Sequence, residues 1–105
     1  MPQGNKIYIA GPMTGIVDLN FPKFNRIAQV LRNEGWEVIN PAEINPDVTM
    51  KWEDCMRRDI AELLQCQHIY MLSGWMASKG AFLEYHIAFE LGLSIWTEEL
   101  HNARA

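Results

Sequence analysis

The chain has 105 residues, a length that accommodates one compact domain and one site. Hydrophobic residues make up 49% and charged residues 21% of it, which is typical of a globular protein and excludes a disordered, collagen-like or coiled-coil chain. The net charge is −4 and the basic residues are scattered, so no basic stripe is present to bind a nucleic-acid polymer. We therefore expect a single domain over residues 1–105.

Two features of the sequence indicate a cytoplasmic protein that does not enter a membrane. No apolar run approaches the ~20 residues of a membrane span, and the N-terminal segment MPQGNK lacks the apolar core of a signal peptide. Cys55 and Cys66 lie on one predicted helix, about 16 Å apart at 1.5 Å per residue, beyond the reach of a disulfide. We expect two reduced thiols and, because the histidines are dispersed, no metal site.

Apolar and amphipathic segments alternate along the chain in the order βαβαβαβ. Strands are predicted at residues 6–11, 36–40, 68–72 and 93–97. Helices are predicted at residues 20–35, at about 52–66, and from the end of the loop 73–80 to Gly92. In the first helix Asn20 is the expected N-cap and Gly35 the expected C-cap. Residues 41–51 are rich in turn formers, and the polar tail from residue 98 is expected to be a frayed helical turn.

This alternation predicts an α/β fold of the flavodoxin or Rossmann type, with three layers and a four-stranded parallel sheet in the order 2-1-3-4. The second and third helices then cover one face of the sheet and the first helix covers the other. Because one helix leaves apolar strand surface uncovered, we expect a homodimer or a higher homo-oligomer. Ligands of such sheets bind where the strand order reverses, and there the loops GPMTG (11–15) and SGWMASKG (73–80) meet.

Two carboxylates occupy core-facing positions on the predicted helices. One apolar stripe contains Glu84, Ile87, Ala88 and Leu91. The stripe of the preceding helix contains Trp52, Cys55, Met56, Asp59, Leu63 and Cys66. Burial costs a lone carboxylate several kcal/mol unless it is paired or protonated. Since both helices pack on the same sheet face, Asp59 and Glu84 can converge at the switch point as catalytic groups; the alternative is a structural carboxylate that caps a loop or pairs with Arg57 or Arg58.

The loop before the third helix predicts an anion site. Ser78, Lys79 and Gly80 lie at the amino end of that helix, where free backbone N–H groups and the helix dipole favour negative charge. Ser78 could equally be an N-cap. Together with the loop after the first strand, the expected substrate-binding residues are Gly11, Pro12, Met13, Gly74, Trp75, Ser78, Lys79 and Gly80.

Two aromatic residues near these loops leave alternatives open. Tyr8 lies in the middle of the first strand, so its hydroxyl can reach the carboxylates or simply belong to the core. Trp75 lies in a loop where nothing requires an aromatic ring. It could stack on a planar base or form an oligomer contact.

Three segments, KIYIAGPMTG (6–15), RRDIAELLQC (57–66) and the pattern SxGxxxExxxxxxxG (78–92), together resemble the nucleoside 2-deoxyribosyltransferase-like superfamily. The resemblance covers nearly the whole chain and is strongest to the short phage and bacterial branch, the domain known as DUF4406. It implies that Glu84 is the glycosyl-accepting nucleophile, that Asp59 assists at the sugar and the base, and that Tyr8 hydrogen-bonds to the nucleophile. In the related 2'-deoxynucleoside 5'-monophosphate N-hydrolases, phosphate is bound at the positions that match Ser78 and Gly80.

The chain departs from the superfamily pattern at several positions. The loop after the first strand has no arginine, Gln67 stands where an acidic residue is usual, and bulky Tyr85 and His86 follow the nucleophile position. The resemblance implies cleavage or transfer of an N-glycosidic bond of a nucleoside or nucleotide through a covalent glycosyl-glutamate, without a cofactor. The alternatives are a non-catalytic nucleotide-binding protein, which the bulky residues favour, and a purely structural oligomerising domain.

Overall fold

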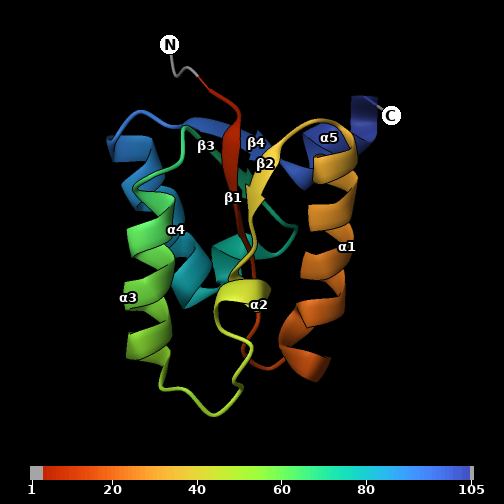
Figure 1. The fold of residues 1–105 in the computed structure, drawn as a ribbon. Helices are drawn as coiled ribbons and strands as arrows, with labels where there is room; N and C mark the ends of the chain where they lie inside the picture. Colours follow the sequence, from red (N-terminus) through yellow and green to blue (C-terminus); the bar gives the residue numbers. More distant parts are fainter. Residues whose placement is uncertain (1–3, 105) are drawn as a thin grey trace.

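The structure of this chain is a computed structural model that describes residues 4–104. Four parallel strands form one sheet in the order β2-β1-β3-β4 (Figure 1). They are β1 (Lys6–Ala10), β2 (Glu37–Ile39), β3 (His68–Met71) and β4 (Ser94–Thr97). The parallel direction and the strand order confirm the prediction from the alternating pattern, because right-handed crossovers leave few other arrangements.

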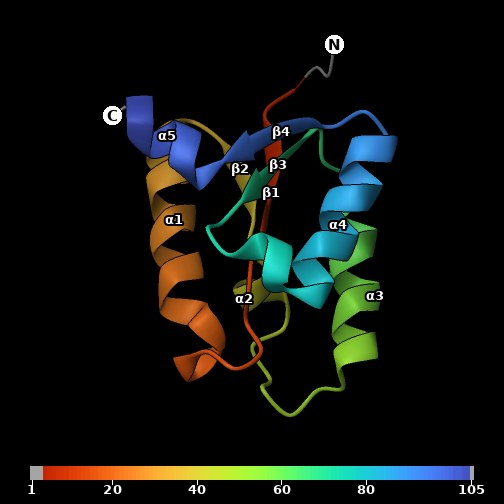
Figure 2. The same ribbon diagram turned by 180° about the vertical axis from the view of Figure 1, so that it is seen from behind.

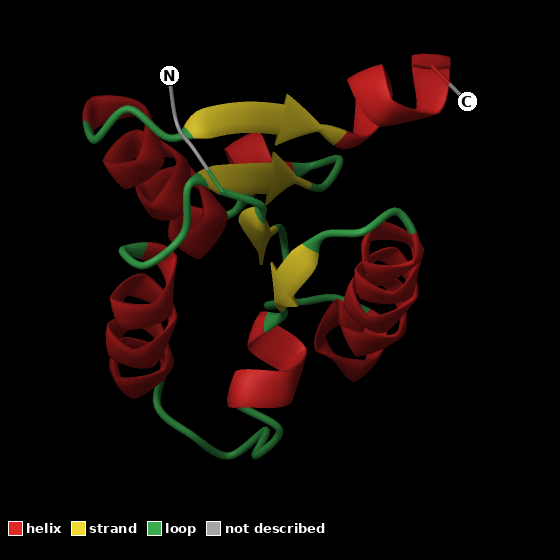
Figure 3. Ribbon diagram, turned by 45° about the horizontal axis from the view of Figure 1, so that its top comes forward, coloured by secondary structure: helices red, strands yellow, loops and turns green. Residues whose placement is uncertain are grey.

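Helices cover both faces of the sheet. They are α1 (Phe21–Asn33), α2 (Pro41–Ile44), α3 (Trp52–Leu63), α4 (Lys79–Glu90) and α5 (Glu98–Arg104), with short 3-10 helices η1 (Val17–Asn20) and η2 (Trp75–Ala77). α3 and α4 lie on one side of the sheet, while α1 and α5 lie on the other (Figures 1 and 2). Figure 3 shows the same three layers with the strands between them. The predicted three-layer α/β fold is therefore confirmed.

The alternation of side chains along β1 divides the core in two. One cluster, between the sheet and α1, contains Ile7, Ile9, Phe24, Ile27, Ala28, Leu31, Val38, Ala42, Tyr70 and Leu72. The other, between the sheet and the α3–α4 pair, contains Tyr8, Ala10, Leu63, Cys66, Ile69, Met71, Ala81 and Ala88. Tyr8 thus points to the side of the sheet from which α3 and α4 present their carboxylates.

The ends of α1 lie near the predicted positions, but the capping contacts differ. Asn20 precedes the helix as expected, yet its side chain donates a hydrogen bond to the carbonyl of Pro12, at 2.9 Å, instead of capping α1. That contact ties the start of α1 to the loop after β1. Glu34 is the C-cap, and Gly35 follows it with φ +99°, a left-handed conformation in which glycine ends a helix at little cost.

Three other predicted segments differ in the structure. α3 ends at Leu63, three residues before the predicted end at Cys66. The segment 41–51, predicted as turns, contains α2, for which Asn40 is the N-cap: its Oδ1 accepts from the N–H of Ala42 at 3.0 Å. The buried apolar stripe of α4 is shorter than predicted. Leu91, its predicted last member, is 59% exposed and lies one residue after the end of the helix.

The tail forms an ordered helix where a frayed turn was expected, because tertiary contacts fix it. Glu98 is buried, forms an ion pair with Lys23 of α1 at 2.9 Å, and accepts from the N–H of Ser73 at 2.8 Å. His101 hydrogen-bonds to the hydroxyl of Tyr70 at 2.7 Å. α5 therefore lies on the same side of the sheet as α1, where the sequence predicted a single helix (Figures 1 and 2). The oligomeric state itself stays a prediction.

Within residues 4–104, none of the helices combines the length and the apolar character needed to cross a membrane.

Candidate functional site

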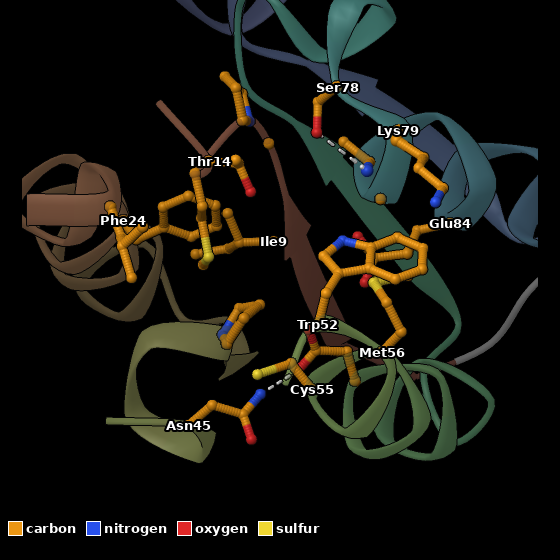
Figure 4. Close-up of a pocket in the computed structure, with 18 of the residues that line it drawn as sticks. Ile9, Thr14, Phe24, Asn45, Trp52, Cys55, Met56, Ser78, Lys79 and Glu84 are labelled. Carbon is orange, nitrogen blue, oxygen red and sulfur yellow. Dashed lines mark hydrogen bonds between the residues drawn. The ribbon is translucent and has the colours of Figure 1, made fainter. Parts of the chain in front are cut away.

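A cavity of about 840 Å³ opens at the carboxyl ends of β1 and β3, where the strand order reverses (Figure 4). Its size lies in the range of small-molecule sites. Its walls come from β1 and the loop that follows, the start of α1, residues 41–53, α3, and the start of α4. Among the lining residues are Tyr8, Gly11, Pro12, Met13, Asp59, Gly74, Ser78, Lys79, Gly80 and Glu84. The loops predicted to meet at this point do so.

Glu84 lies one turn inside α4 and is only 4% exposed. The hydroxyl of Tyr8, itself fully buried, donates a hydrogen bond of 2.6 Å to its Oε2. Burial raises the pKa of Glu84 to about 8, against the opposing effect of the Tyr8 hydrogen bond. Burial and the neighbouring carboxylates also hold the pKa of Tyr8 well above its ordinary value, so this phenol remains a donor at neutral pH.

Asp59, on the buried side of α3, is the second carboxylate of the cavity. The Nδ2 of Asn45 donates to its Oδ1 at 2.7 Å. Burial raises the pKa of Asp59 to about 6, and hydrogen bonding from Asn45 and Tyr8 keeps the pKa from rising further. Asp59 and Glu84 therefore converge on Tyr8, as the helical stripes predicted.

The structural alternatives for these carboxylates were capping a loop and pairing with Arg57 or Arg58. The hydrogen bond from Asn45, just after α2, to Asp59 is of the first kind. Arg57 instead lies 3.9 Å from Asp54 in an exposed pair, and the guanidinium of Arg58 contacts the sulfur of Met50 at 3.7 Å. The two buried carboxyls thus have different neighbours and different pKa values, the condition under which one group of a pair acts as an acid while the other is an anion.

The amino end of α4 forms another part of the cavity wall. Ser78 is the N-cap, and its Oγ accepts from the N–H of Ala81 at 3.3 Å. Lys79 and Gly80 are the first two residues of the helix, and N–H groups at these positions have no partner within a helix. The ammonium of Lys79 lies 4.1 Å from the centroid of the Trp52 ring. Backbone donors, a positive helix end and a cation therefore occupy one side of the cavity.

Two glycines of the cavity lie in closely packed places. A Cβ on Gly80 would lie 3.1 Å from the sulfur of Met56, so glycine lets the start of α4 approach α3. A Cβ on Gly11 would lie 2.7 Å from the Cβ of Leu72, which no ordinary contact permits. At both positions the lack of a side chain lets the neighbouring segments of the cavity wall pack closely.

Trp75, predicted to line the site or to form an oligomer contact, is not among the cavity residues. Its ring packs against Tyr85, with centroids 4.5 Å apart, and stacks on Phe82 at 6.1 Å. The aromatic wall comes instead from Trp52, in the first turn of α3 (Figure 4). The sequence places Trp52 only in an apolar stripe; its position at the helix start, next to the carboxyl ends of the strands, is the signal that distinguishes it.

Asn45 is the other site residue that the sequence did not indicate. It is 7% exposed and lies just after α2, a helix absent from the predicted elements. One side of its amide donates to Asp59, while its Oδ1 has no hydrogen-bond partner among the described residues. The sequence around position 45 does not predict the contact with Asp59, because this contact depends on how α2 docks against α3.

Within residues 4–104 there is no group of three or more His, Cys, Asp or Glu side chains placed to hold a metal ion. Both cysteines, Cys55 and Cys66, are free thiols.

The fold and the cavity define an open α/β domain with a ligand-sized pocket at the switch point of a parallel sheet. A family model described as Domain of unknown function (DUF4406) matches residues 5–97. The chain therefore belongs to the DUF4406 family. The match runs from β1 to the end of β4 and includes Tyr8, Asp59 and Glu84, whereas α5 lies beyond it. No curated protein matches the chain.

Proposed function

We propose that this domain cleaves or transfers the N-glycosidic bond of a nucleoside or nucleotide, with Glu84 as the nucleophile that accepts the glycosyl group. One observation carries the proposal: a buried glutamate, hydrogen-bonded by a buried tyrosine at 2.6 Å, lines a cavity that also contains a second buried carboxyl. Retaining glycoside chemistry requires two carboxyl groups with different roles. The resemblance to the nucleoside 2-deoxyribosyltransferase-like superfamily assigns the same roles to Glu84, Asp59 and Tyr8.

The first step forms an ester. An oxygen of the Glu84 carboxylate attacks the anomeric carbon, the bond from that carbon to the base nitrogen breaks, and the base leaves with the electron pair. Asp59, in its acid form, gives a proton to the departing base. In the second step water or another base attacks the same carbon, the ester oxygen leaves as the Glu84 carboxylate, and the Asp59 carboxylate takes up the released proton. No cofactor is needed for either step.

With pKa values of about 8 for Glu84 and about 6 for Asp59, a proton is held more strongly by Glu84, so the form with the proton on Asp59 and the charge on Glu84 is the minor form of the singly protonated pair. Between these two pH values the pair holds one proton. The reaction requires that proton on Asp59 and the negative charge on Glu84. The hydrogen bond from Tyr8 stabilises this charge, and so does the positive charge that develops on the sugar in the transition state. We therefore expect activity to be greatest between about pH 6 and pH 8.

The cavity walls suit a nucleotide. The Trp52 ring offers an apolar surface for a planar base, and the amino end of α4 with Lys79 offers donors and positive charge for a 5'-phosphate. Lys79 would take the place of the arginine that is missing from the loop after β1. A single small molecule, not a polymer, fits a cavity of about 840 Å³ in a chain of net charge −4. The free thiols fit a cytoplasmic setting.

The test is release of base. Purified protein is incubated with a panel of nucleosides and their 5'-monophosphates, and free base is measured by reverse-phase chromatography. The parent should release base from at least one member, whereas Glu84→Gln should not, because an amide cannot accept the glycosyl group. Glu90→Gln, a change of an exposed glutamate on the same helix, is the matched control and should retain activity. Calorimetric binding with no release from any member would instead support the non-catalytic nucleotide-binding alternative.

A further inference from the structure

Four aromatic rings form a cluster at α4 and the turn that precedes it. Trp75 of η2 is followed by Phe82, Tyr85 and Phe89 of α4, and we call these four residues the α4 aromatic surface. The ring of Tyr85 is central: its centroid lies 4.5 Å from that of Trp75, 6.5 Å from that of Phe82 and 6.1 Å from that of Phe89. Trp75 also stacks on Phe82, with centroids 6.1 Å apart. Figure 2 views α4 and the preceding turn from outside, with no other element in front of them.

The two phenylalanines of this surface are exposed, which is unusual for apolar side chains on the outer side of a helix, whereas Trp75 and Tyr85 are partly buried against the core. Phe82 is 50% and Phe89 59% exposed, and Leu83 and Met76 beside them are also exposed. The inner side of α4 is buried in the core through Ala81 and other small residues. α4 is therefore apolar on both sides, and only one side has a partner within the described chain. A contiguous exposed patch of this kind marks an interaction site.

We propose that the α4 aromatic surface is the interface of a homodimer, in which two copies of α4 pack antiparallel about a two-fold axis. Phe82 and Phe89 are seven residues, or about two turns, apart and lie on either side of Tyr85. Such an axis, placed close to Tyr85, sets Phe82 of each copy against Phe89 of the other. A two-fold interface requires a patch that is complementary to itself, and this spacing provides it.

The charges on α4 fit the same arrangement. Glu90, exposed near the carboxyl end of α4, lies one residue beyond Phe89 and outside the four rings. His86 is the other exposed polar side chain, in the middle of α4. No cluster of like charges is present on the outer side of α4 to repel a second copy.

The available area is adequate for a dimer. A half-exposed phenylalanine presents on the order of 100 Å², and a symmetric interface counts each side chain once on each copy. With Met76, Leu83 and the exposed parts of Trp75 added, the total reaches the roughly 1,000 Å² that a specific interface needs. The cavity lies on the opposite side of α4, where Glu84 points inward, so a dimer of this kind leaves the cavity open. The proposal does not depend on the reaction proposed above.

The experiment measures mass in solution. Sedimentation velocity and size exclusion with light scattering, over roughly 1 to 100 µM protein, should give twice the 12.1 kDa chain mass for the parent. Phe82→Glu and Phe89→Lys, each at an exposed position, should each give monomers with unchanged far-ultraviolet circular dichroism. An equimolar mixture of the two variants should restore the dimer, since the antiparallel pairing sets the new glutamate against the new lysine and leaves one Phe82–Phe89 contact intact.

A control variant tests the other side of the sheet. Val30 of α1 is 38% exposed, and Val30→Glu should leave the dimer unchanged. A parent that is monomeric at every concentration would overturn the proposal, as would dimers that survive both phenylalanine substitutions. A mixture of the variants that stays monomeric would overturn the antiparallel pairing. Dissociation by Val30→Glu alone would move the interface to the α1 side.

Discussion

Replacing Glu84 by glutamine should change the pH dependence of stability in a defined direction. Burial raises the pKa of Glu84 from its ordinary 4.5 to about 8. The folded protein therefore holds a proton on this group over an interval in which the unfolded chain has released it, and stability falls as the pH rises through that interval. Glutamine cannot ionise, and it can still accept the hydrogen bond that Tyr8 donates to Glu84.

The size of this loss of stability follows from the pH interval between the ordinary pKa of Glu84, 4.5, and its raised pKa of about 8. Each pH unit costs the parent about 1.4 kcal/mol of unfolding free energy, so ionising Glu84 costs about 4 to 5 kcal/mol once the pH is above about 8. This is a large share of the roughly 5 to 15 kcal/mol of a typical domain. Relative to the parent, Glu84→Gln should therefore gain several kcal/mol between about pH 5 and about pH 9.

Urea unfolding followed by tryptophan fluorescence measures this difference, since the chain contains four tryptophans. The parent, Glu84→Gln and the surface control Glu90→Gln are compared at several pH values. The control should follow the parent. If Glu84→Gln also followed the parent, Glu84 would not be a buried titrating group, and the argument for its role in the site would fail.

Three further variants test the neighbours of the two carboxyls. Tyr8→Phe removes the hydrogen bond that lowers the pKa of Glu84, so the upper limit of the pH–rate profile should move above about 8 and the rate should fall by roughly 10- to 100-fold; an unmoved limit would contradict the assigned role. Asn45→Ala removes a hydrogen bond that lowers the pKa of Asp59, so the lower limit should rise above about 6; the same profile as the parent would show that this contact does not tune the acid. Lys79→Ala should weaken binding of a nucleoside 5'-monophosphate by roughly 10-fold and leave the matching nucleoside unaffected, as measured by calorimetry, and equal losses for both would place the phosphate elsewhere.

The fold could be predicted because its determinants are local. Short apolar runs separated by amphipathic runs define strands and helices, and the handedness of crossovers then restricts the strand order. The Glu84 and Asp59 positions were readable for the same reason, since a carboxylate inside a helical apolar stripe must face the core. Tyr8 followed from the two-residue period of β1.

What could not be predicted depends on contacts between distant segments. α5 is ordered through Glu98, which pairs with Lys23 more than seventy residues earlier in the chain. Asn45 reaches Asp59 only because α2 docks against α3. Trp52 lines the cavity and Trp75 does not, because the ring of Trp75 packs on Tyr85 instead. Local sequence patterns do not predict such contacts between distant segments.

Intact-protein mass spectrometry after a rapid acid quench tests the central claim most directly. With a substrate that releases base, the parent should gain the mass of one glycosyl unit, located by peptide mapping at Glu84, and Glu84→Gln should gain none. Glu90→Gln should form the same adduct as the parent. Base release at an equal rate by Glu84→Gln, or an adduct on any other residue, would contradict the account.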